Sequence, residues 1–91
     1  MIEEERDSHV LSAKEGQQLH AMINTKGWSD VVRPALEAKV QYLYGEIANA
    51  LTYEEFVRIQ QSINAIKSLL SFIKVKLVEG KIALEELGKN P

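Results

Sequence analysis

Two histidines, His9 and His20, are the side chains of this chain best suited to bind a metal or to transfer a proton. No carboxylate stands at the H-E-x-x-H or a similar spacing, which would place two ligands on one face of a helix. The sequence has no cysteine, so thiolate ligands, thiol nucleophiles and disulfides are excluded. We therefore predict neither a metal site nor a cofactor.

Two pairs of adjacent glutamates, at positions 54–55 and 85–86, are the remaining candidates for acid and base chemistry. Adjacent residues of a helix point in different directions, and the helix dipole favours carboxylates near a helix start without any catalytic role. The phosphate-binding loops G-x-x-x-x-G-K-[ST] and G-x-G-x-x-G and the nucleophile motif G-x-S-x-G are absent. The sequence therefore predicts no catalytic residue and no enzymatic activity.

Three lysines, Lys67, Lys74 and Lys81, recur every seven residues and form a basic edge along one predicted helix. In a coiled coil such flanking charges select the partner and its orientation, whereas on DNA they would meet phosphates. A solvated flank explains the same lysines. Because the net charge is −2, nonspecific nucleic-acid binding is disfavoured and a protein partner is preferred.

The helix that carries these lysines is predicted over residues 53–87. Thr52 and Glu55 form a capping box at its start. Its apolar seam alternates spacings of three and four residues, which is a heptad pattern interrupted at Gly80. The seam comprises Phe56, Ile59, Ile63, Ile66, Leu70, Ile73, Leu77, Leu84 and Leu87. A break at Gly80, with a fourth short helix folding back, is an alternative, and the alternation in residues 71–78 would also suit a strand.

Two shorter helices are predicted upstream, over residues 12–24 and 29–50, after an acidic frayed tail at residues 1–8. Ser12 begins the first of them as a helix cap, and Pro34, early in the second, predicts a bend around residues 31–33. The chain is thus expected to be a single all-α domain spanning residues 1–91. Its architecture is predicted to be a helical hairpin or three-helix bundle with a long, heptad-patterned C-terminal helix.

A difference in helix length suggests where a partner binds. A helix over residues 53–87 would be about 52 Å long, against roughly 30 Å for the helix before it. The last apolar residues of the long helix would then be uncovered, and we expect a protein partner or a second copy of the chain to cover them. Trp28, at a predicted turn, either plugs the end of the bundle or anchors a partner. The predicted partner-binding residues are Phe72, Ile73, Leu77, Leu84, Leu87, Lys67, Lys74, Lys81 and Trp28.

Two segments carry a resemblance to a protein family: G-W-S-D-V-V-R-P-A-L-E at residues 27–37 and E-F-V-R-I-Q-Q-S-I-N-A-I-K-S-L-L at residues 55–70. Together they resemble small helical proteins encoded among tailed-phage structural genes. The resemblance implies a virion or assembly component, and it carries no functional residue over to this chain.

The function expected from the sequence is a non-enzymatic protein-interaction module that associates through its long apolar helix. Two alternatives stay open: a small nucleic-acid-binding regulator that uses the lysine edge, and an inhibitor of a host enzyme. No signal peptide or membrane span is predicted, so the expected location is the cytoplasm, meaning the host cytoplasm or the virion for a phage protein.

Overall fold

The protein is all-α, as predicted. The structure, a computed structural model, describes residues 2–89, and this part of the chain contains helices and their connections but no strand. The elements are α1 (Glu3–Ile23), the π-helix η1 (Gly27–Val32), α2 (Arg33–Ala48) and the long C-terminal helix α3 (Tyr53–Lys89). They form two compact units. The terminal unit contains the residues up to Thr25 and those from Phe72 onward, and the middle unit is Lys26–Ser71.

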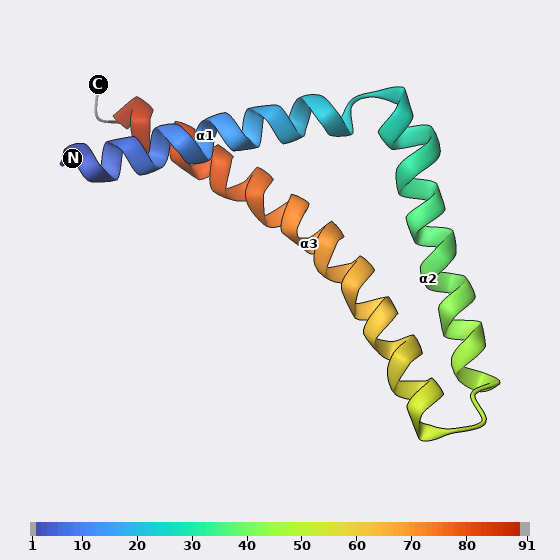
Figure 1. Ribbon diagram of the computed structural model, residues 1–91. Helices are drawn as coiled ribbons and strands as arrows, with labels where there is room; N and C mark the ends of the chain where they lie inside the picture. Colours follow the sequence, from blue (N-terminus) through green and yellow to red (C-terminus); the bar gives the residue numbers. More distant parts are fainter. Residues whose placement is uncertain (1, 90–91) are drawn as a thin grey trace. The chain divides into compact units, whose positions relative to one another are not determined.

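Helix α3 runs without a break through Gly80 (Figure 1). No glycine among residues 2–89 has a positive φ, so Gly80 does not form the left-handed cap that would end the helix. The alternatives of a fourth helix after Gly80 and of a strand at residues 71–78 are therefore wrong. Gly80 has a packing role instead, described below.

The predicted cap at Thr52 is present. The backbone N–H of Glu55 donates to the Thr52 hydroxyl oxygen at 3.1 Å, and the Glu55 carboxylate accepts the N–H of Leu51 at 3.0 Å. The returning bond reaches the residue before the cap, so this is a close variant of the predicted capping box. Two backbone donors that the helix cannot satisfy are thereby paired.

Replacing Thr52 with alanine is expected to lower the free energy of unfolding by about 1 kcal/mol, because an N-terminal donor of α3 loses its acceptor. Urea denaturation followed by circular dichroism measures this change. Ser71→Ala, at an exposed position inside α3, is the control and is expected to change stability by less than about 0.5 kcal/mol. Equal effects of the two substitutions would contradict a capping role for Thr52.

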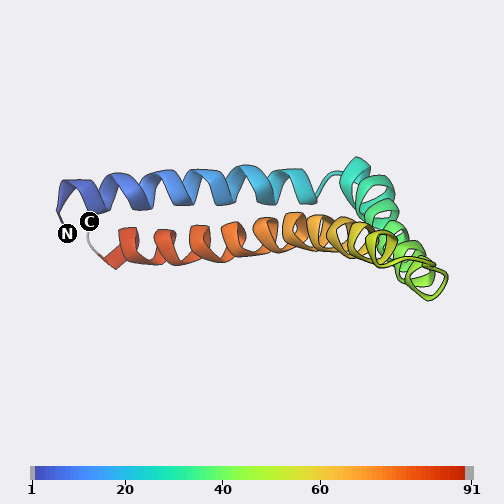
Figure 2. The same ribbon diagram turned by 60° about the horizontal axis from the view of Figure 1, so that its bottom comes forward.

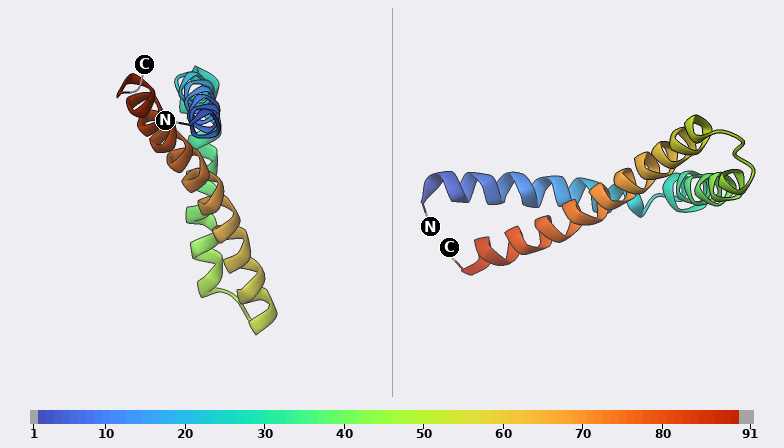
Figure 3. Two further views of the ribbon diagram at one scale, coloured as in Figure 1. Left: turned by 90° about the vertical axis from the view of Figure 1, so that its left-hand side faces the viewer. Right: turned by 90° about the horizontal axis from the view of Figure 1, so that it is seen from below.

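The middle unit has its own core, formed where α2 and the first part of α3 run side by side (Figure 3). The 3.6-residue period of both helices brings the apolar side chains at every third or fourth position onto the shared face. Val40, Leu43 and Ile63 are buried there. Ile47, Ile59 and Ile66 are partly buried against them.

The entry to α2 is a π-helix. The N–H of Arg33 bonds to the Trp28 carbonyl, five residues back. Pro34 follows directly. Because proline has no backbone N–H, position 34 cannot donate the α-helical hydrogen bond to the carbonyl four residues before it. The irregularity predicted at residues 31–33 therefore extends upstream over Gly27–Val32, and α2 begins at Arg33 rather than at residue 29.

The terminal unit corrects the prediction for the first helix. Helix α1 begins at Glu3, so the segment predicted to be a frayed tail is helical, and Ser12 lies inside the helix instead of capping it. The three glutamates of the first turn stabilise this start, because carboxylates favour the positive end of the helix dipole. Helix α1 lies antiparallel beside the last part of α3 (Figure 2).

The two helices of the terminal unit touch through glycines. A Cβ atom on Gly80 would lie 2.8 Å from the Gly16 Cα and 3.1 Å from the Ser12 carbonyl oxygen. A Cβ atom on Gly16 would lie 2.9 Å from the Gly80 Cα. Ala13 and Ala83 are also buried, and Ala83 is only 1% exposed. Small side chains along this line allow the backbones to approach closely, which larger residues would prevent.

Candidate interaction surface

The last part of α3 has a second apolar face that no part of the described terminal unit covers. Val75, Val78 and Ile82 are 49%, 53% and 51% exposed, and we call these three residues the outer stripe. Val78 and Ile82 each lie two residues from the buried Gly80, which corresponds to about 200° around a helix. The outer stripe therefore faces away from α1.

Charged residues flank the outer stripe on both sides. Lys74 and Lys81 directly precede Val75 and Ile82, whereas Glu79 directly follows Val78, and Glu86 stands seven residues after Glu79. One flank is therefore basic and the other acidic. Within residues 2–89, no carboxylate lies at ion-pair distance from Lys74 or Lys81, whereas Glu79 and Glu86 pair with Lys76 and Lys89 of the same helix at 3.6 and 3.4 Å.

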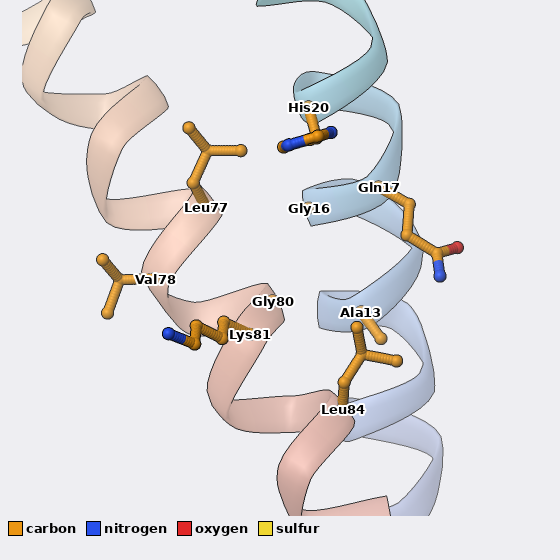
Figure 4. Close-up of a pocket in the computed structure, with 9 residues that line it drawn as sticks. All are labelled: Ala13, Gly16, Gln17, His20, Leu77, Val78, Gly80, Lys81 and Leu84. Atoms are coloured by element: carbon orange, nitrogen blue, oxygen red, sulfur yellow. The ribbon is translucent and has the colours of Figure 1, made fainter.

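An apolar groove of about 530 Å³ lies along the contact between α1 and α3 (Figure 4). The side chains of Leu77 and His20 face each other across it, and Leu84 lies against Ala13. Val78 and Lys81 form its outer edge and point away from α1. The groove forms because the contact between Gly16 and Gly80 at its floor brings the two backbones together. Leu77 and Leu84 of α3 line the groove and take no part in that contact.

The basic edge predicted from the heptad lysines is divided between the two units. Lys67 belongs to the middle unit, where its ammonium group donates to the Tyr44 hydroxyl and lies 4.9 Å from the centre of the same ring. This cation–π contact and hydrogen bond hold Lys67 within its own chain. Lys74 and Lys81 belong to the terminal unit and remain exposed.

Lys76, one turn before Gly80, connects the helices of the terminal unit. Its ammonium group lies 3.8 Å from the Glu15 carboxylate of α1 and 3.6 Å from Glu79. It also lies 5.8 Å from the centre of the Phe72 ring. These partly exposed contacts place Lys76 between α1 and the acidic flank of the outer stripe.

Three of the predicted partner-binding residues, Ile73, Leu77 and Leu87, are more buried than expected. Ile73 is buried within the chain, and Leu77 and Leu87 are half-buried, so the prediction that the end of the seam is uncovered is wrong for them. The physical reason is that α1 packs along this part of α3, where Gly16 meets Gly80 and His20 faces Leu77 (Figure 4). Leu84 is 47% exposed because Ala83 occupies the buried position in its place.

Phe72 is exposed, as the prediction requires, and lies beside the outer stripe. Trp28 lies in the middle unit, in η1, and is half-buried. Its placement agrees better with a packed side chain than with a fully exposed anchor. Phe72, Leu84, Lys74 and Lys81 are thus the predicted residues that the terminal unit leaves accessible.

The sequence-based site residues omitted the outer stripe itself. Its signal was present, because Val75, Val78 and Ile82 repeat the three-and-four spacing of the main seam with a different phase. The glycine contact was also missed. A glycine in each of two helices indicates close packing only when the two are known to face each other, and a single sequence does not supply that pairing.

No group of three or more potential metal ligands occurs among residues 2–89, and no helix in that range is long and apolar enough to cross a membrane. Comparisons of the chain with protein-family models, with curated proteins and with solved structures find no match.

Proposed function

We propose that this protein is a non-enzymatic interaction module whose outer stripe binds a helix of a protein partner. The observation that carries the proposal is the second apolar face of α3. A helix that only packs against α1 needs one apolar face, yet Val75, Val78 and Ile82 form another about opposite to it. Helices with apolar residues on two sides are typical of helices packed between two neighbours.

The energetics support this proposal. Fully burying a valine or isoleucine side chain contributes about 1.5–3 kcal/mol, and each residue of the outer stripe has about half of that contribution still to gain. Together the three provide several kcal/mol, which must offset the entropy lost on association. This balance favours reversible binding over permanent assembly.

We also propose that the protein acts in the assembly of a phage particle. The resemblance to small helical proteins of tailed phages suggests a virion or assembly component in the host cytoplasm. A small domain of this kind would act by joining protein subunits through helix-to-helix burial. Nucleic-acid binding is less well supported, because Lys67 is engaged by Tyr44 and the basic edge is reduced to Lys74 and Lys81 in the terminal unit.

Val78→Glu is expected to abolish binding, because it places a charge in the centre of the outer stripe. The chain, immobilised at one end, is used to capture proteins from the cells in which it is naturally expressed, and its mass in solution is measured in parallel by light scattering. We expect the wild type to retain a protein or to self-associate, and Val78→Glu to do neither.

Val10→Glu is the matched control. Val10 is also a helical valine of the terminal unit and is 48% exposed, but it lies on α1 and outside the outer stripe. We expect Val10→Glu to behave as the wild type does. If Val78→Glu retained the same proteins and had the same mass as the wild type, the proposed function would be refuted.

A further inference from the structure

We propose that the partner of the outer stripe is a second copy of this chain, aligned parallel and in register. This inference rests on the proposed function and identifies its partner.

The outer stripe follows a heptad. If Val75 and Ile82 occupy the first core position of successive heptads, then Val78 occupies the second core position and Glu85 closes the stripe. In the same frame Lys74 and Lys81 both fall just before a core position, on one flank. Glu79 and Glu86 both fall just after a core position, on the other flank.

Symmetry then decides the orientation. When two identical helices lie parallel about a twofold axis along their length, the basic flank of each helix faces the acidic flank of the other. Lysines therefore face glutamates across a parallel pair. When the helices lie antiparallel, like flanks meet, so lysines would face lysines and glutamates would face glutamates, which is repulsive.

The register follows from the spacing. In parallel coiled coils the flanking residue before one core position faces the partner's flanking residue five positions later, and such pairs select partner and orientation. Lys74 and Glu79 are five residues apart, and so are Lys81 and Glu86. A parallel pair in register therefore brings Lys74 to the partner's Glu79 and Lys81 to the partner's Glu86, with two symmetric copies of each contact.

The single chain leaves Lys74 and Lys81 available, whereas Glu79 and Glu86 already make contacts on their own helix. Lys74 and Lys81 are exposed and pair with no carboxylate of residues 2–89. Glu79 pairs with Lys76 through a partly exposed contact on its own helix, which can be exchanged at small cost. Because α1 lies against the opposite face of α3, it does not occupy the space that a second α3 would require.

The first test reverses the charges of one flank at a time. We expect K74E/K81E and E79K/E86K each to weaken self-association about tenfold or more, measured by sedimentation equilibrium over a concentration series. The quadruple variant with all four reversals has the net charge of the wild type, so it controls for general repulsion. We expect it to self-associate within about threefold of the wild type. Undiminished association of the two double variants would overturn the parallel arrangement.

The second test uses the absence of cysteine from the chain. Glu85→Cys puts one thiol at the end of the outer stripe, where parallel copies in register bring position 85 beside its counterpart. Under mild oxidation we expect a disulfide-linked dimer. Val10→Cys, off the stripe, is expected to form no disulfide-linked dimer. An antiparallel pair would place the two introduced thiols at opposite ends, so failure to cross-link would also overturn the proposal.

The results separate this inference from the proposed function. Suppose that the wild type stays monomeric at every concentration and captures a protein that the Val78→Glu variant does not capture. This result would refute a second copy as the partner and would leave the proposed interaction module intact. If neither mass nor capture responds to Val78→Glu, both are refuted.

Discussion

Replacing Gly80 with alanine is expected to lower the free energy of unfolding by about 1–3 kcal/mol, as overpacking of a tight contact does. The new Cβ atom would lie 2.8 Å from the Gly16 Cα and 3.1 Å from the Ser12 carbonyl oxygen. Both neighbours are backbone atoms, so no side-chain rotation can relieve the overlap and α1 must move away from α3. Urea denaturation monitored by circular dichroism measures the loss.

Gly45→Ala is the matched control for this prediction. Gly45 lies inside α2, and a Cβ atom added to it would meet nothing within 4 Å, so alanine gains helix propensity there without an overlap. We expect Gly45→Ala to raise the free energy of unfolding by about 0.5–1 kcal/mol. If Gly80→Ala stabilised the protein in the same way, the close contact between α1 and α3 would be wrong.

Replacing Ile63 with alanine is expected to lower the free energy of unfolding by about 2–5 kcal/mol. Ile63 is 3% exposed and packs with Val40 and Leu43, so its removal leaves a cavity in the core of the middle unit. The same denaturation experiment measures the effect, and the size of the change depends on how far the neighbours collapse into the space.

Leu69→Ala serves as the comparison, because Leu69 lies on the same helix and is 47% exposed. The aliphatic side chain removed is of the same size, but less of it is buried. We expect this substitution to cost less than half as much as Ile63→Ala. Similar losses at the two positions would show that the core of the middle unit does not centre on Ile63.

The start of α3 and most of its apolar seam could be predicted from the sequence. Its cap at Thr52 depends on local hydrogen bonds, and its seam depends on a repeat that continues for many turns, so both are readable without knowing what α3 packs against. Only the phase of the seam near its end differed, where Ala83 is buried in place of Leu84.

The length of α1 was not predictable in the same way. Residues 3–11 include four acidic side chains and few apolar ones, so they lack the periodic signal that identifies a helix. Residues 3–8 are all exposed, so their helical state comes from acidic residues at a helix start and from continuing the part of α1 that packs against α3. The error about Leu77 and Leu87 has another cause: the sequence did not show that α1 packs beside the last part of α3.

The candidate site was predicted in location but not in composition. The sequence placed a partner-binding surface on the last part of α3, and its residues Phe72 and Leu84 are exposed there. Which of the two apolar faces of this segment stays open depends on which one α1 covers. That choice depends on the small residues at positions 13, 16, 80 and 83, whose effect arises only when the two helices meet.

Sedimentation equilibrium of the wild type and Val78→Glu over a wide concentration range tests the central claim most directly. A single chain has a mass of 10.3 kDa. With the outer stripe as the association surface, the apparent mass of the wild type rises toward twice this value, while that of Val78→Glu stays at the mass of one chain. A Val78→Glu variant that self-associates as strongly as the wild type would contradict the account.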